Sequence, residues 1–217
     1  HAVTRAEHLA NAVLIGELTG LPVNGDFEDG YGTSPSDVAA TVEAAIGAGL
    51  AGIGIEDTTA DPSNPIREFD DAVKRVREAA KAAKGRILLT GRTDNFLQGR
   101  PDLEDTIKRL VAFADVGADV LYAPYPTDMD AVRTIVKAVA PKPVNLVVGT
   151  MRGTLPWGEL QKAGGKRVSL GVALYTRVMG DLRKAARQLA DGDLASASEG
   201  IGFGEIKKMI AEATKER

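Results

Sequence analysis

The chain has 217 residues, of which 44% are hydrophobic and 5% aromatic, and a formal net charge of −3. This composition is typical of one globular domain, and the scattered basic residues argue against nucleic acid or an anionic membrane as the main partner. No apolar run reaches the roughly 20 residues that a membrane span needs, and the absence of cysteine excludes disulfides and a cysteine nucleophile in this chain and fits a cytoplasmic protein.

Short runs rich in Val, Ile and Leu alternate with segments of helical period along the chain. The predicted strands cover residues 21–26, 52–56, 87–92, 120–124, 144–148 and 168–170. The predicted helices cover residues 4–18, 35–48, 66–83, 103–116, 128–139, 157–162, 174–191 and 203–215. Strand–helix–strand units of this length predict a parallel sheet with right-handed connections.

The spacing of the strands favours a closed barrel. A (β/α)8 TIM barrel needs eight strands and about 250 residues, whereas six strands are predicted here. The first predicted element is a helix with no strand before it. We therefore expect residues 1–217 to form a single (β/α)8-barrel domain whose first one or two βα units are missing from this chain. The alternative is an open doubly wound sheet, but no Gly-x-Gly-x-x-Gly turn follows the first predicted strand.

Acidic residues gather where the first two predicted strands end. Asp26 and Glu28 lie two residues apart on a segment predicted to be extended, so their side chains should point the same way. Glu56 ends the neighbouring strand and should face the same space. Converging carboxylates need a counter-charge, and hard oxygen ligands suit Mg²⁺, with Mn²⁺ as an alternative. For Asp29 and Asp57 we favour the simpler interpretation that they cap the following helices.

Two further polar residues are candidates for substrate binding. Arg92 ends a buried strand, and its guanidinium matches a substrate carboxylate bidentately. The alternative is a structural salt bridge to Glu56 or Asp94. Asn145 offers a donor and an acceptor beside that carboxylate, although a core asparagine that satisfies loop backbone is nearly as good an interpretation.

Glycine-containing turns suggest where backbone approaches a ligand. At Gly30 and Tyr31, between two glycines, the chain can come close to a substrate. The glycines at 164–165 and 171, near Ser169, are typical of barrel phosphate sites, although a helix cap explains the first pair better.

Five motifs together resemble those of the isocitrate lyase / phosphoenolpyruvate mutase superfamily, and the likeness runs from about residue 5 to residue 193. The motifs are Pro-Val-Asn-Gly-Asp-Phe-Glu-Asp-Gly-Tyr-Gly at 22–32, Gly-Ile-Glu-Asp at 54–57, Gly-Arg-Thr-Asp-Asn-Phe at 91–96, Lys-Pro-Val-Asn at 142–145 and Arg-Val-Ser-Leu-Gly at 167–171.

The resemblance implies a (β/α)8 barrel, assembled as a tetramer in which C-terminal helices are exchanged between subunits. It implies that Asp26 binds Mg²⁺ directly, that Glu28 is the second acid of the family pair, and that Glu56 reaches the metal through water. By the same resemblance, Arg92 binds the substrate carboxylate and Asn145 is a polar ligand on the next wall. The metal and Arg92 would stabilise an enolate.

The segment after Glu56 departs from the lyase pattern. Isocitrate and methylisocitrate lyases carry a Cys-containing loop here, whereas residues 58–65 contain no Cys, His or Lys. Phosphoenolpyruvate mutases carry an Asn-Ser in a comparable loop, and Asn64 lies at a similar distance from Glu56. We therefore take Asn64, with Arg92, as a candidate catalytic residue. The mutase histidine is replaced by residues 123–125.

The leading hypothesis is an Mg²⁺-dependent lyase or phosphonomutase-like enzyme that cleaves or rearranges a C–C or P–C bond next to a 2-oxo or 2-hydroxy carboxylate. A non-catalytic carboxylate-binding or regulatory barrel is the alternative, and an unrelated phosphate-binding barrel is a third hypothesis. We expect a small carboxylate substrate, a homodimer or homotetramer, and no nucleic acid or membrane partner.

Overall fold

The computed structural model describes residues 2–147 and 156–215, which fall into two compact units. The first unit ends at Leu170 and contains a six-stranded sheet; the described residues of the second, which begins at Gly171, form helices and turns. The strands are β1 (Asn24–Asp26), β2 (Gly52–Glu56), β3 (Leu88–Arg92), β4 (Val120–Tyr122), β5 (Val144–Val147) and β6 (Arg167–Ser169).

The order of the strands identifies the winding of the sheet. All neighbouring strands are parallel, and each pairs with the next along the chain. An open doubly wound sheet would reverse its order at a switch point, so that alternative is wrong. The first unit is a curled half-barrel of six parallel strands, the winding found in part of a TIM barrel.

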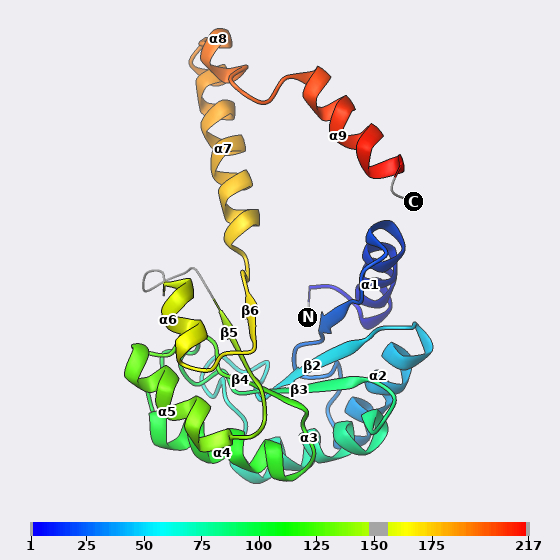
Figure 1. The fold of residues 1–217 in the computed structure, drawn as a ribbon, viewed down its shortest axis with the longest axis vertical. Helices are drawn as coiled ribbons and strands as arrows, with labels where there is room; N and C mark the ends of the chain where they lie inside the picture. Colours follow the sequence, from blue (N-terminus) through cyan, green and yellow to red (C-terminus); the bar gives the residue numbers. More distant parts are fainter. Residues whose placement is uncertain (1, 148–155, 216–217) are drawn as a thin grey trace. The chain divides into compact units, whose positions relative to one another are not determined.

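Helices connect the strands and cover the outside of the half-barrel. In Figure 1, α2 to α5 form an arc outside the strands. The helices of the first unit are α1 (Arg5–Thr19), α2 (Pro35–Gly47), α3 (Phe69–Ala83), α4 (Leu103–Asp115), α5 (Met129–Val139) and α6 (Trp157–Lys162). The second unit contains α7 (Ala173–Ala190), α8 (Leu194–Ala197) and α9 (Phe203–Lys215). Within the described ranges, no helix is long and apolar enough to cross a membrane.

Side chains along each strand point alternately to the hydrophobic core and to the inner face of the half-barrel. Ile53 and Ile55 of β2, Leu89 of β3 and Leu121 of β4 are fully buried and belong to one hydrophobic core with the outer helices. Successive side chains of a strand point to opposite faces. The residues between these core positions therefore face the inside of the half-barrel, which is where the candidate site lies.

Several boundaries differ from the predicted ones. Strand pairing begins at Asn24 rather than at residue 21. Helix α3 begins at Phe69 rather than at residue 66, because Ile66 forms an isolated antiparallel bridge with Thr58. The short helix α8 was not predicted, and Val148, placed in the fifth strand, lies outside the described residues. A single domain with exchanged terminal helices stays a prediction.

A substitution at Gly91 would test how closely β3 packs against α4. A Cβ atom at Gly91 would lie 3.1 Å from the Cβ atoms of both Phe113 and Ala118. We expect Gly91→Ala to lower the free energy of unfolding by about 1 to 3 kcal/mol, because overpacking displaces core side chains. Urea unfolding followed by circular dichroism measures the change.

Gly47→Ala is the matched control, because a Cβ atom there meets nothing within 4 Å. It should leave stability unchanged or raise it slightly, as alanine is the better helix former. Equal stability of the two variants would contradict the close packing of β3 on α4.

Candidate functional site

Five side chains form one row across the inner face of the half-barrel, which we call the inner row. The strand pairing aligns Glu56 with Arg92 and Arg92 with Tyr122. It then aligns Tyr122 with Asn145 and Asn145 with Arg167. Residues aligned in this way on parallel strands project to the same face. Polar groups from five consecutive strands are therefore brought together.

The guanidinium of Arg92 contacts three carboxylates. Its Nε and Nη2 donate to the two oxygens of Asp94 at 2.6 and 2.8 Å. Its Nη1 donates to Asp26 Oδ2 at 2.8 Å and lies 3.1 Å from Glu56 Oε2. The side chains of Arg92, Glu56 and Asp94 are 13%, 10% and 1% exposed, so water screens their charges weakly, whereas the Asp26 side chain is 63% exposed. One positive charge thus faces three acidic groups, two of which are largely desolvated.

Glu56 reduces this excess of negative charge because its carboxyl group retains a proton. Burial, together with the charge of Asp94, raises the pKa of Glu56 to about 8 against the opposing charge of Arg92. The Thr58 hydroxyl donates to Glu56 Oε1 at 2.6 Å and fixes the carboxyl group. Near neutral pH, the site therefore holds Glu56 mainly in its protonated form.

The other end of the inner row is basic. Asn145 is 1% exposed, and its Oδ1 accepts from Arg167 Nε at 2.8 Å while its Nδ2 donates to Ser169 Oγ at 3.1 Å. Tyr122 lies between the two arginines of the row, with the Arg92 guanidinium carbon 5.3 Å from its ring centroid. Burial raises the pKa of Tyr122 to about 12, so its phenol is neutral at ordinary pH.

A buried network holds the loops behind Arg92. Asp57, 1% exposed, accepts the Asp94 N–H at 3.0 Å and lies 3.2 Å from Arg109 Nη1. Arg109 projects from α4 and also contacts Asp105 and the carbonyl of Arg67, at 2.7 and 2.9 Å. Burial raises the pKa of Asp57. Because Asp94 orients Arg92, this network fixes the guanidinium indirectly.

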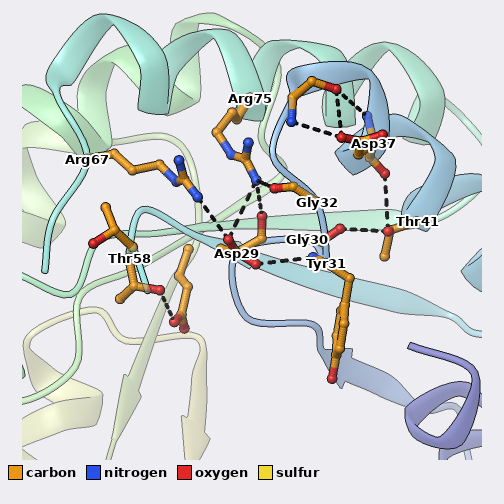
Figure 2. A network of polar contacts seen from close by, with 12 residues as sticks. Asp29, Gly30, Tyr31, Gly32, Asp37, Thr41, Thr58, Arg67 and Arg75 are labelled. Atoms are coloured by element: carbon orange, nitrogen blue, oxygen red, sulfur yellow. Dashed lines mark hydrogen bonds and ion pairs between the residues drawn. The ribbon is translucent and has the colours of Figure 1, made fainter. Parts of the chain in front are cut away.

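A second network holds the loop after β1 (Figure 2). Asp29 accepts from Arg67 Nη2 at 2.8 Å and from the Tyr31 N–H at 3.2 Å. Arg75 is almost fully buried, and one of its nitrogens donates to the carbonyls of Asp29 and Gly32 at 2.7 Å each. These contacts tie α3 to the loop after β1.

Neither Asp29 nor Asp57 caps a helix, so that interpretation is wrong for both. The N-cap of α2 is Ser34, whose side chain accepts the Asp37 N–H, and the N-cap of α3 is Glu68. Asp29 instead forms an ion pair with Arg67, which lies just before α3, and Asp57 forms one with Arg109 of α4.

Of the predicted metal ligands, the structure brings Asp26 and Glu56 together at Arg92. The extended geometry assumed for Glu28 is wrong, because β1 ends at Asp26 and the φ of Glu28 is +51°. Glu28 is exposed, and its carbonyl accepts the Glu56 N–H at 2.9 Å. The role of Glu28 as a metal ligand stays a prediction.

Gly30 and Tyr31 lie in a turn that contacts the first two helices. The Gly30 carbonyl accepts from the Thr41 hydroxyl at 2.6 Å. The Tyr31 hydroxyl lies 3.0 Å from His8 Nδ1, and its ring meets Phe27 edge-on. Substrate binding by this turn stays a prediction.

Asn64 and Asn145 occupy different environments. Asn64 is exposed in the loop between β2 and α3, where its N–H donates to the Asp61 carbonyl and its own carbonyl accepts from Thr59. Asn145 stands in the inner row, with both ends of its amide hydrogen-bonded. The salt-bridge interpretation of Arg92 matches its contacts with Asp94 and Glu56, and these contacts leave its proposed role in substrate binding open.

Two residues of the inner row, Tyr122 and Arg167, received no predicted role. Tyr122 lies in a segment that was predicted as a strand, and Arg167 belongs to one of the five motifs. The face of the sheet to which their side chains project depends on the register between strands, which no local sequence pattern specifies. In the part of the chain that the structure describes, no three or more His, Asp or Glu side chains are grouped to hold a metal ion.

Comparisons with known proteins show which family the chain resembles. Residues 1–190 match the family model described as phosphoenolpyruvate phosphomutase. A crystal structure from Burkholderia cenocepacia J2315, described as a lyase/mutase, is 39% identical with a TM-score of 0.91, covering 96% of this chain and 76% of that chain. Oxaloacetate acetylhydrolase in complex with its product oxalate is 27% identical with a TM-score of 0.82, covering 95% and 73%. Oxaloacetate decarboxylase of Paraburkholderia xenovorans LB400 is 35% identical over 131 residues, 56% of this chain and 42% of that protein.

The raised pKa of Glu56 predicts a loss of stability with rising pH. In the unfolded chain Glu56 titrates near its ordinary value of 4.5, so between that pH and about 8 the folded state holds a proton that the unfolded state has released. The stabilisation is complete below about pH 4.5 and is lost as pH rises through about 8.

We expect the free energy of unfolding in urea to fall from about pH 6 to about pH 8 by roughly 1 kcal/mol or more, since one pKa unit corresponds to about 1.4 kcal/mol. In Glu56→Gln, which cannot ionise, this fall should be much smaller. The same fall in both proteins would show that Glu56 is already ionised at the lower pH.

Proposed function

Because this chain belongs to the isocitrate lyase / phosphoenolpyruvate mutase superfamily, a group of lyases and mutases, we propose that it is an Mg²⁺-dependent lyase or phosphonomutase-like enzyme. It would cleave or rearrange a C–C or P–C bond next to a 2-oxo or 2-hydroxy carboxylate through an enolate. The observation that carries the proposal is the meeting of the Asp26 and Glu56 carboxylates at one nitrogen of Arg92, at the ends of three neighbouring strands.

The donors at this position fit a hard dication. Asp26 and Glu56 supply carboxylate oxygens that lie close together, since both contact Arg92 Nη1. Mg²⁺ is commonly held by one or two carboxylates, with waters and substrate oxygens completing its octahedron. The excess of acidic groups, expressed in the raised pKa of Glu56, is the charge imbalance that a dication would relieve. Asp26 and Glu56 would hold the metal, with Glu28 as a third candidate.

When bound, Mg²⁺ would neutralise the charge that develops on the enolate oxygen. Arg92 would bind the substrate carboxylate through Nη1, the nitrogen that faces Asp26 and Glu56. Asp94 holds the Nε and Nη2 edge of the same guanidinium, so its orientation persists when Nη1 changes partner. Such preorganised donors contribute to catalysis because they need no reorganisation during the reaction.

We propose that the complete fold is an eight-stranded (β/α)8 barrel and that it works as a homodimer or homotetramer in the cytoplasm. Asn64 is proposed as a catalytic residue of the loop between β2 and α3, and Gly30, Tyr31 and Asn145 as contacts to the substrate.

A second candidate function is a carboxylate-binding barrel without turnover. It is favoured by the loop at residues 58–65, which contains no Cys, His or Lys to transfer a proton. Such a protein would bind oxalate, an enolpyruvate mimic, but would leave a panel of 2-oxo and 2-hydroxy acids unchanged.

Calorimetry with Mg²⁺ and oxalate tests the metal site. We expect oxalate binding that depends on Mg²⁺, and we expect Asp26→Asn and Glu56→Gln each to weaken it roughly tenfold or more, because each removes a carboxyl group that can ionise to bind the metal. Asp130→Asn is the matched control, since its side chain is 92% exposed on α5 and lies outside the inner row.

If wild-type protein binds no oxalate in the presence of Mg²⁺, the proposed function is wrong. If Mg²⁺ supports oxalate binding equally in Asp26→Asn, Glu56→Gln and wild type, the metal lies elsewhere.

A further inference from the structure

Thr58 lies at the base of the loop between β2 and α3, two residues after Glu56. Its backbone pairs with Ile66 in the isolated antiparallel bridge, and the N–H of Thr59 donates to the Pro65 carbonyl at 2.9 Å. Ile66 is fully buried, so this pairing fixes the backbone that carries the Thr58 hydroxyl. A branched side chain such as that of threonine also has few rotamers, which places the hydroxyl further.

The Thr58 hydroxyl occupies one of the two oxygens of the Glu56 carboxyl group. It donates to Oε1 at 2.6 Å (Figure 2). The other oxygen, Oε2, lies 3.1 Å from Arg92 Nη1, which also donates to Asp26 Oδ2 at 2.8 Å. The two oxygens of Glu56 therefore face different partners. Only Oε2 faces the position at which Asp26 and Glu56 would hold a metal.

Burial keeps the Glu56 carboxyl group in this orientation. The Glu56 side chain is 10% exposed, and its backbone N–H donates to the Glu28 carbonyl at 2.9 Å. A rotation that turned both oxygens toward Asp26 would break the hydrogen bond from Thr58. Because little water reaches the carboxyl group, the lost bond would not be replaced, and an unmade hydrogen bond at a buried group is costly.

The number of oxygens that a carboxylate offers affects which dication it binds best. Mg²⁺ requires a nearly ideal octahedron at roughly 2.0–2.1 Å and takes few protein oxygens, with waters as its other ligands. Ca²⁺ takes about six to eight oxygens at roughly 2.3–2.6 Å and often binds both oxygens of one carboxylate. A carboxylate that offers a single oxygen therefore disfavours Ca²⁺ more than Mg²⁺.

We propose that Thr58 is a positioning residue that sets the metal selectivity of the site, because it keeps Oε1 of Glu56 away from the metal. The site then favours Mg²⁺ over Ca²⁺. Thr58 touches neither the metal nor the substrate in this arrangement and acts through Glu56. The inference rests on the proposed function, from which it takes the position of the metal.

Two substitutions separate the hydroxyl from the rest of the Thr58 side chain. Thr58→Val keeps the branched shape beside Ile66 but removes the hydrogen-bond donor. Thr58→Ser keeps the donor and removes only the methyl group. A role of Thr58 that is limited to closing the loop would leave the choice between metals unchanged in both variants.

Calorimetric titration of Mg²⁺ and of Ca²⁺ into the metal-free protein, without any organic acid, measures the selectivity. We expect Thr58→Val to shift the ratio of the two affinities toward Ca²⁺ by about tenfold, since loss of a partner that orients a ligand typically changes metal affinity by about 10- to 100-fold. Thr58→Ser should keep the wild-type ratio. Each metal displaces the same proton from Glu56, so the ratio cancels any change in protonation.

Thr134→Val is the matched control. Thr134 is exposed on α5, outside the inner row, and its hydroxyl donates to the Asp130 carbonyl at 2.7 Å. This variant should keep the wild-type affinities for both metals. Thermal unfolding shows whether each variant is folded, and Thr58→Ala, which also lacks the hydroxyl, takes the place of Thr58→Val if the latter does not fold.

Two results would overturn the inference while leaving the proposed function intact. One is an unchanged ratio in the variant without the hydroxyl, and the other is an equal shift in Thr58→Ser. A wild-type protein that binds neither metal alone would also overturn it. The proposed function is decided separately, by whether wild type binds oxalate in the presence of Mg²⁺.

Discussion

Arg92 carries one positive charge to a position where Asp26, Glu56 and Asp94 supply up to three negative ones, and Glu56 and Asp94 are largely removed from water. Asp94 takes two nitrogens of the guanidinium and sets its orientation, whereas Asp26 and Glu56 share the third. The surplus of negative charge at that nitrogen explains both the proton retained by Glu56 and the suitability of the position for a dication.

The register of the strands extends this local arrangement across the sheet. Because consecutive parallel strands align one residue each, the inner row runs from Glu56 on β2 through Arg92 on β3, Tyr122 on β4 and Asn145 on β5 to Arg167 on β6. Polar side chains that are far apart in the sequence are therefore placed side by side on the inner face.

The sequence predicted the strand and helix order because buried strands and amphipathic helices alternate clearly along the chain, and residues 52–56 were predicted with their observed bounds. The convergence of Asp26 and Arg92 could also be predicted, since ends of parallel strands meet at one edge of a sheet. The left-handed backbone conformation of Glu28 could not be predicted, because a non-glycine residue gives little local signal for it. The position of Arg167 beside Asn145 could not be predicted either, because it depends on the register between two separate strands.

The loop between β2 and α3 is closed at its base by the chain itself. Thr58 and Ile66 pair in an antiparallel bridge, and the Asp57 carbonyl accepts the Arg67 N–H at 2.8 Å. Arg109 anchors that base from α4. Because these contacts involve the two ends of the segment, substitutions within residues 60–64 should leave the strand that carries Glu56 in place. The shape and chemistry of that segment can then change independently of the carboxyl group beside it.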